Sequence, residues 1–185
     1  MTVTRNAIGL LELSSIAMGF FATDVMLKTA DVKLILSRTV CPGKFITLIW
    51  GEVSAIQASM ETGIKASQGY IVNDLIIPNL DEQVFPAMTA TNPVKEKGAL
   101  GIHETFDIVS SIIAADAAVK AAIVTLVEIR VAMAIGGKAF YMVTGDVSAV
   151  EASIKAGLEA IEGKGQTVYW VVIPRPRDEL FQEFV

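Results

Sequence analysis

Apolar runs and helical periodicity alternate along the first half of the chain. Residues 7–13 are short and almost wholly apolar, which predicts a strand. Residues 15–30 place Ile16, Phe20 and Leu27 around polar positions at helical spacing, which predicts a helix. Residues 32–40 and 45–50 are rich in Val, Ile, Leu, Thr and Phe, and the turn Pro42-Gly43 lies between them. They predict two strands joined by that turn.

A second helix and a last strand complete the pattern. Ile56, Met60 and Ile64 recur every four residues, and we expect their helix to be capped either by Ser54, in a capping box, or by Glu52. Residues 70–77 predict a strand that ends at Pro78. The order β-α-β-β-α-β is the ferredoxin-like plan, an α+β fold (an α/β sandwich) in which two helices cover one face of an antiparallel sheet.

The pattern occurs twice. The first strand returns at residues 99–105, and the last strand returns at residues 167–173, again followed by proline. Asp24 and Lys28, which are spaced to pair on one helix face, return as Asp116 and Lys120. A repeat of this length indicates a duplicated domain rather than a solenoid unit. We predict a first domain over 7–86, a polar linker over 87–98 and a second domain over 99–185.

Composition narrows the class of protein. Apolar residues make up 52% and charged residues 19% of the chain, which indicates apolar surface buried between the halves or between subunits. No uninterrupted apolar run is long enough to span a bilayer, and no secretory signal is evident. The net charge of −5 argues against a nucleic-acid partner. A single cysteine fits a reducing cytosol. We therefore expect a cytoplasmic protein with neither a membrane nor a nucleic acid as partner.

Candidate catalytic chemistry is sparse. The sequence contains no Walker loop, no G-x-G-x-x-G and no G-x-S-x-G, and one histidine excludes a multi-histidine metal site. His103 stands where the first copy has Leu11, and we interpret it as a residue at a strand edge or subunit contact. Glu12 and Glu104 recur at equivalent positions; a catalytic carboxylate pair is one interpretation, and a shared structural role is the simpler one. We expect that the protein is not an enzyme.

Several motifs together identify a family. The strand A-I-G-L-L-E-L, the helix carrying D-x-x-L-K, the Gly-Lys turn after the second strand and the I-P-R-P ending resemble bacterial microcompartment shell proteins. Two copies in one chain resemble the tandem-domain members, and the loop T-V-C-P-G-K-F is most similar to the iron-sulfur-binding trimeric shell proteins of propanediol-utilisation compartments. This resemblance implies a homotrimer that forms a pseudo-hexameric tile, meets other tiles edge to edge and encloses enzymes.

The resemblance also implies a central pore. The loop after the second strand of each domain would line it, and the pore residues are then Cys41, Pro42, Gly43 and Lys44 from the first copy and Ala134, Ile135, Gly136 and Gly137, followed by Lys138, from the second. Three Cys41 thiolates, one per chain, would ligate three irons of a 4Fe–4S cluster, one per trimer. Such a cluster would transfer electrons across the shell or supply clusters to encapsulated redox enzymes.

The same resemblance assigns residues to the tile edge. Lys28 and Lys120 match the edge lysine of the family, and Arg175 matches its edge arginine, whereas the first copy has Asn79 at that position. Two alternative functions remain open. One is a tile with an open metabolite pore and no cluster, in which Cys41 only lines the gate. The other, from a different class, is a trimeric ligand-sensing regulator, which the ferredoxin-like plan also suits.

Overall fold

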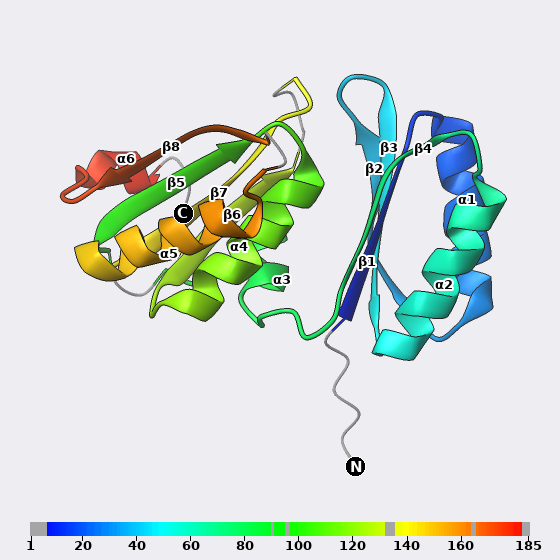
Figure 1. The fold of residues 1–185 in the computed structure, drawn as a ribbon, viewed down its shortest axis with the longest axis horizontal. Coiled ribbons are helices and arrows are strands. Elements are labelled where there is room, and N and C mark those ends of the chain that lie inside the picture. Colours follow the sequence, from blue (N-terminus) through cyan, green and yellow to red (C-terminus); the bar gives the residue numbers. More distant parts are fainter. Residues whose placement is uncertain (1–6, 90, 95–96, 132–135, 164–165, 183–185) are drawn as a thin grey trace, which may run out of the picture. The chain divides into compact units, whose positions relative to one another are not determined.

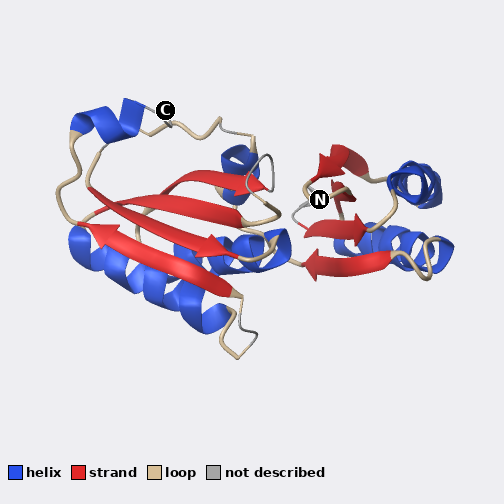
Figure 2. Ribbon diagram, turned by 90° about the horizontal axis from the view of Figure 1, so that it is seen from above, coloured by secondary structure: helices blue, strands red, loops and turns tan. Residues whose placement is uncertain are grey.

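A computed structural model of the chain describes every residue except 1–6, 90, 95–96, 132–135, 164–165 and 183–185. The chain divides into two compact units, Met1–Leu80 and Asp81–Val185. Each unit contains one antiparallel four-stranded sheet with two long helices on one of its faces (Figures 1 and 2). The predicted α+β fold with two ferredoxin-like domains is confirmed.

The first unit follows the predicted element order. Its elements are β1 (Ala7–Leu13), α1 (Ile16–Thr29), β2 (Lys33–Val40), β3 (Lys44–Gly51), α2 (Val53–Ala66) and β4 (Ile71–Ile77). The strand order in the sheet is β2-β3-β1-β4, so β2 and β4 are the edge strands. Ser15 caps α1 by accepting a hydrogen bond from the Met18 N–H at 3.3 Å. Glu52, rather than Ser54, is the N-cap residue of α2, although its side chain makes no capping bond.

The second unit repeats this order and adds two short helices. Its elements are α3 (Val84–Met88), β5 (Ala99–Thr105), α4 (Ile108–Ala121), β6 (Thr125–Val131), β7 (Ala139–Gly145), α5 (Val147–Ala160), β8 (Thr167–Ile173) and α6 (Asp178–Gln182). The strand order is β6-β7-β5-β8. Residues 81–86, which the sequence pattern placed in the first domain, belong to this second unit because the side chain of Gln83 bonds to the backbone of β6.

The core of the first unit lies between its sheet and its helices. Its fully buried members are Ala7, Leu11, Leu13, Ala22, Met26, Ile49, Ile56 and Met60. On α1 the buried face consists of Gly19, Ala22, Thr23 and Met26. The apolar positions that predicted this helix lie elsewhere, since Ile16, Phe20 and Leu27 are exposed by 42, 62 and 37%. The helix is therefore present as predicted, but the stripe used to predict it faces away from the core.

The two copies fill the same core positions with different side chains. In the first unit an added Cβ at Gly19 would lie 2.2 Å from the ring of Phe45, which fills that space. In the second unit Ser111 stands at the position of Gly19 and Ala139 at that of Phe45, both fully buried. The smaller residue on the strand thus accompanies the larger one on the helix, so the two exchanges change side-chain volume in opposite directions.

Candidate functional site

The first candidate pore loop is a tight turn. β2 ends at Val40, β3 begins at Lys44, and the Cα atoms of these two residues are partners across the ladder. Gly43 has φ +75°, a left-handed conformation that favours glycine. Cys41 is partly exposed, and Pro42 and Gly43 are exposed. The turn therefore presents the one thiol of the chain at the end of a hairpin.

A buried ion pair fixes the base of this turn. The Lys44 Nζ donates to the Glu12 Oε1 at 2.7 Å, and Glu12, in the inner strand β1, is only 3% exposed. A carboxylate with so little access to water needs a charged partner. The second copy has the same pair, because Lys138, directly after its loop, contacts Glu104. These pairings support the shared structural role of Glu12 and Glu104, each of which anchors the lysine that ends a loop.

The second candidate loop differs from the first in length. Five residues, 40–44, lie between the ladder partners Thr39 and Phe45, and seven, 132–138, lie between the equivalent partners Val131 and Ala139. Ala134 and Ile135 lie outside the described residues. Gly136 and Gly137 have φ values of +67° and +87°, so the described part of the loop also turns through left-handed glycines. The second copy therefore has two more residues here, as it also has between its second helix and last strand, where residues 161–166 stand against residues 67–70.

Metal-ligating side chains do not cluster within one chain. Among the described residues, no three of His, Cys, Asp and Glu lie close enough to hold a metal ion. A cluster would need its other thiolates from further copies of Cys41, since the sequence has no second cysteine. The donor set therefore fits a 4Fe–4S cluster only in an assembly that brings three Cys41 side chains together.

The lysines assigned to the tile edge pair with the aspartates one turn before them. The Lys28 Nζ lies 2.6 Å from the Asp24 Oδ2 on the exposed side of α1. The Lys120 Nζ lies 2.6 Å from the Asp116 Oδ2 on α4, where the Asp116 carboxyl is nearly buried. The pairing expected from the four-residue spacing is thus present in both copies.

Arg175 lies in the exposed segment just after β8. The position that matches it in the first copy is Asn79, whose backbone is left-handed with φ +56°. Asparagine adopts this conformation more readily than most residues. The two copies therefore differ here in backbone shape as well as in charge.

The lone histidine lies inside the second unit. β5 is an inner strand between β7 and β8, and His103 is 0% exposed, so its interpretation as a residue at a strand edge or subunit contact is wrong. Its Nε2 lies 3.0 Å from the Thr167 Oγ1, and its Nδ1 lies 3.4 Å from the Tyr141 hydroxyl. Burial lowers the pKa of His103 to about 4 and raises the pKa of Tyr141. The imidazole is therefore neutral at physiological pH and acts as a core side chain.

In the first copy, Leu11 stands at the position of His103 and Thr47 at that of Tyr141. Thr47 forms a buried hydroxyl pair with Thr23 at 2.5 Å, and Thr23 also donates to the Gly19 carbonyl. The sequence did not predict these polar contacts of the two cores. Each one can be identified only when the strand register shows which residue lies opposite.

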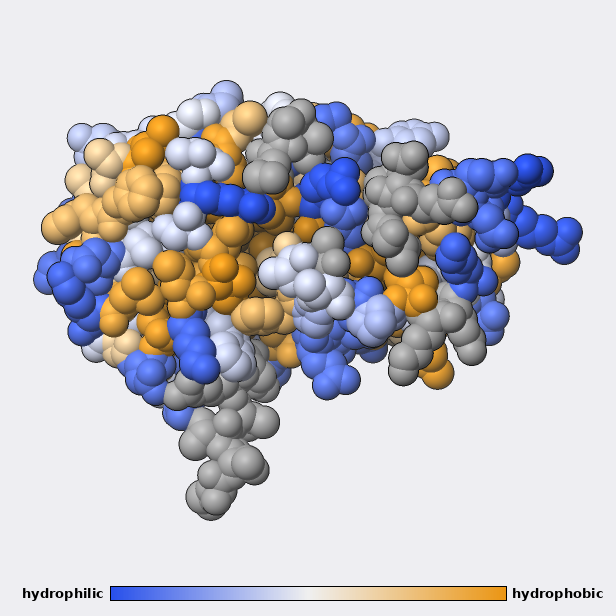
Figure 3. Space-filling model, turned by 180° about the vertical axis from the view of Figure 1, so that it is seen from behind, coloured by the Kyte–Doolittle hydropathy of each residue, from blue (hydrophilic) through white to orange (hydrophobic). Residues whose placement is uncertain are grey.

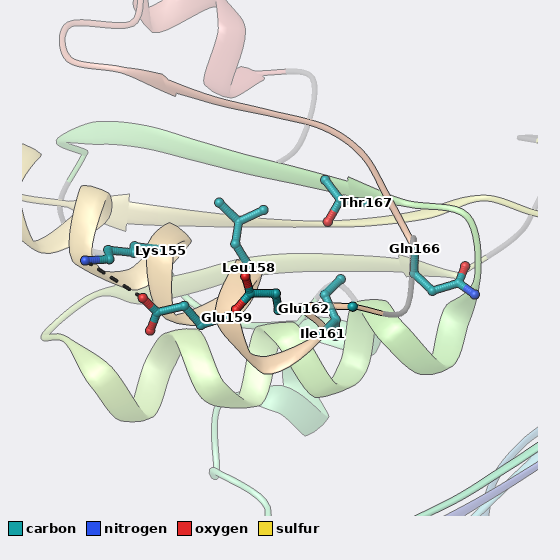
Figure 4. Close-up of a pocket in the computed structure, with 8 residues that line it drawn as sticks. Lys155, Leu158, Glu159, Ile161, Glu162, Gln166 and Thr167 are labelled. Atoms are coloured by element: carbon teal, nitrogen blue, oxygen red, sulfur yellow. Dashed lines mark ion pairs between the residues drawn. The ribbon is translucent and has the colours of Figure 1, made fainter.

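A surface hollow of about 420 Å³ lies at the carboxyl end of α5 (Figure 4). Charged and polar side chains line it together with Leu158 and Ile161; the Lys155 Nζ lies 3.8 Å from the Glu159 Oε1, and Thr167 lies on the opposite wall. Its lining residues bring no nucleophile and base together. The described part of the chain also contains no helix with the length and apolar character needed to cross a membrane.

Comparisons with known proteins agree with this architecture. A family model, described as the BMC domain, matches residues 7–80 and again 99–176. The shell protein PduT of Citrobacter freundii, described as a bacterial microcompartment shell protein, is 44% identical over 97% of this chain and 98% of its own length. The carboxysome assembly protein CcmO of Synechococcus elongatus is 32% identical over 95% of this chain and 67% of its own length.

Solved structures give the same result. A crystal structure of a microcompartment protein from Desulfitobacterium hafniense superposes with a TM-score of 0.91 at 48% identity, covering 95% of this chain and 98% of that one. A fused, permuted hexameric shell protein of another microcompartment has a TM-score of 0.60 at 23% identity over 83% of this chain and 79% of that one, which shows a shared fold. The chain belongs to the BMC-domain family and is a tandem-domain bacterial microcompartment shell protein, a structural component rather than an enzyme.

Proposed function

We propose that three copies of this chain close into a pseudo-hexameric tile of a microcompartment shell in the cytoplasm. Six BMC domains then surround one axis, and loops 41–44 and 134–138 alternate around a central pore. Such a ring is a closed assembly of heterologous contacts. Lys28, Lys120 and Arg175 form the outer edge, where the tile meets other shell tiles.

We further propose that the pore binds a redox cofactor. The observation that carries this proposal is the divergence of the two loops, since one presents a partly exposed thiol at the end of a tight turn and the other has no cysteine. Three Cys41 thiolates related by a threefold axis match three irons of a 4Fe–4S cubane, and the fourth iron takes a non-protein ligand. The cluster, when bound, supplies one-electron chemistry at the shell, for electron transfer across it or for delivery to enzymes inside.

The turn itself supports that role. Gly43 places no side chain beside the thiol, so backbone N–H groups are accessible to donate to cluster sulfurs. The ion pair of Lys44 with Glu12 directs the nearest lysine of the loop into the strand base rather than toward the thiol. Cys41 therefore has room to approach its symmetry mates.

The test is anaerobic reconstitution of the full chain and of Cys41→Ala with iron and sulfide. We expect the wild type to bind close to four irons per three chains, with visible absorption and, after reduction, a paramagnetic resonance signal, and Cys41→Ala to bind none. Cys41→Ser controls for side-chain size, and light scattering verifies that each variant keeps the oligomeric state of the wild type. Equal iron and sulfide in wild type and Cys41→Ala refutes the cluster and leaves a tile with an open metabolite pore. A monomer in light scattering refutes the ring, and saturable small-molecule binding without sheet formation points to a ligand-sensing regulator instead.

A further inference from the structure

Segment 81–92 covers the outer edge of the second sheet. We call it the clamp segment; residue 90 within it lies outside the described residues. The Gln83 Oε1 accepts a hydrogen bond from the Leu126 N–H at 2.9 Å, and its Nε2 donates to the Val124 carbonyl at 3.3 Å. The Asn92 amide donates to the Leu126 carbonyl. These bonds satisfy backbone groups of β6, an edge strand that would otherwise offer them to another chain.

The clamp segment also holds the neighbouring helix. The Asp81 N–H donates to the Asp116 Oδ1 at 2.9 Å, while the other oxygen of that carboxylate accepts from Lys120. Val84 and Ala87 of α3 are fully buried. One short segment thus binds both an edge strand and the Asp-Lys pair, repeated in both copies, on the helix beside it.

The first unit presents the same surface on β2 and α1. The ladder of β2 shifts register between Leu34 and Leu36, as that of β6 does between Leu126 and Glu128, so the two edges match residue by residue. Leu34 is 44% exposed, and Phe20 on α1 is 62% exposed. Hydrophobic side chains gather on the surface of the first unit, at the left of the view in Figure 3. This surface therefore exposes apolar area beside its edge strand.

The carboxyl-terminal segment corresponds to the clamp segment in sequence position, although in the single chain it packs on its own unit. Each follows a last strand that ends in Ile-Pro, and counting from that pair places Leu180-Phe181 of α6 at the positions of Val84-Phe85 of α3. Phe181 packs on its own sheet against Leu100, Val127 and Met142. Glu179, on the same short helix, is exposed, and its Oε1 lies 3.2 Å from Nη2 of the exposed Arg177.

The carboxyl-terminal segment and the edge strand β2 carry opposite charges at corresponding positions. Glu179 stands at the position of Gln83, and Lys33 stands at the position of Thr125. The neutral pair Gln83 and Thr125 therefore corresponds to an acid and a base, Glu179 and Lys33. The Lys33 amine is exposed and lies 5.6 Å from the centre of the Trp50 ring. The Arg177 guanidinium holds the pKa of the Glu179 carboxyl below its usual value, which keeps that carboxyl ionised.

We propose that residues 177–182 of one chain bind the first unit of a second copy, along the edge of β2 and the exposed face of α1. Glu179 then lies beside Lys33, and its carboxylate accepts from the Leu34 N–H as Gln83 accepts from the Leu126 N–H. Each chain gives this segment to the next, so the contact is heterologous and closes only as a ring. The inference rests on the proposed ring and specifies the segment that joins one chain to the next.

A charge swap in the full chain tests this contact. Glu179→Lys and Lys33→Glu each place like charges at the contact, and we expect each to raise the concentration at which the oligomer dissociates by about tenfold, as juxtaposed like charges across an interface do. The double variant restores opposite charges and is expected to return most of that loss. Glu162→Lys, an exposed substitution of the same charge change outside both segments, is the matched control. Dissociation is followed by mass photometry and sedimentation over a dilution series at low and high salt.

Each outcome separates the two proposals. A wild type that stays monomeric at all concentrations overturns the ring itself. A wild-type trimer that the single variants weaken no more than the control does, or that the double variant fails to restore, overturns the exchanged segment and leaves the ring in place. Restoration by the double variant, with association that salt weakens in the wild type and the double variant and strengthens in the singles, supports the contact.

Discussion

The ion pair at the base of the thiol loop gives the sharpest prediction about stability. Lys44→Met removes the cation from Glu12, whose side chain is 3% exposed, while that of Lys44 is 25% exposed. Breaking a buried pair by removing one partner costs about 3–5 kcal/mol, and the partial exposure of Lys44 favours the lower end, about 3 kcal/mol. In a domain of this size that loss lowers the melting temperature by roughly 12 °C or more.

The duplicated chain supplies its own control. In the matching pair the side chains of Glu104 and Lys138 are 31% and 41% exposed, so Lys138→Met should cost no more than about 1 kcal/mol. Both variants are compared by calorimetry at one fixed protein concentration, because association shifts the melting temperature.

A second substitution separates charge from packing. Glu12→Gln combined with Lys44→Met leaves no unpaired charge, and this double variant should be more stable than Lys44→Met alone. Equal losses from Lys44→Met and Lys138→Met refute the argument from burial. A double variant less stable than Lys44→Met shows that an unpaired Glu12 charge is not the cause of the loss.

Two further predictions concern the cores. The pKa of His103 is lowered to about 4 in the folded chain, whereas it has its ordinary value near 6.5 in the unfolded chain. Between these pH values the unfolded state binds more protons than the folded state. The free energy of unfolding therefore falls as the pH drops from 7 to 4. Urea unfolding should show a loss of roughly 2–3 kcal/mol over that range, which His103→Leu abolishes; an unchanged pH profile in the variant contradicts this assignment. Gly19→Ala should destabilise the first unit by about 1–3 kcal/mol, because the added methyl group clashes with Phe45. In thermal unfolding, Phe45→Leu in the same chain should return part of that loss. Additive losses from the two substitutions contradict the packing argument.

The fold was predictable from the sequence because its signals are local. Strand and helix periodicities, turn glycines and the repeat specify the order of elements and the two domains without knowledge of tertiary contacts. The inner position of His103 follows from the predicted ferredoxin-like plan, because the first strand of that plan pairs with the third and the fourth strands. The partners of its side chain do not follow in the same way, because they depend on the register of those strands.

The boundary of the clamp segment escaped prediction for a similar reason. Residues 81–86 follow the last strand of the first copy directly, and their polar composition is that of a connection. Their assignment to the second unit depends on hydrogen bonds from Gln83 to a strand more than forty residues later. The repeat did identify Glu12 with Glu104 as equivalent positions, but not the ion pairs that each of them forms with the lysine at the end of a loop.

The differences between the copies fall into two physical kinds. Some lie within a core, as when Ser111 with Ala139 replaces Gly19 with Phe45, so that a gain in size on the helix accompanies a loss on the strand. Others lie on the surface: the thiol of Cys41 lies at an exposed turn, and the acid of Glu179, which pairs with Arg177, is exposed on the last short helix. A change that packing within the unit does not balance has its physical consequence at a contact with another molecule. Duplication gives that freedom, because two linked domains can diverge on their outward surfaces while each keeps its core, and six identical domains cannot.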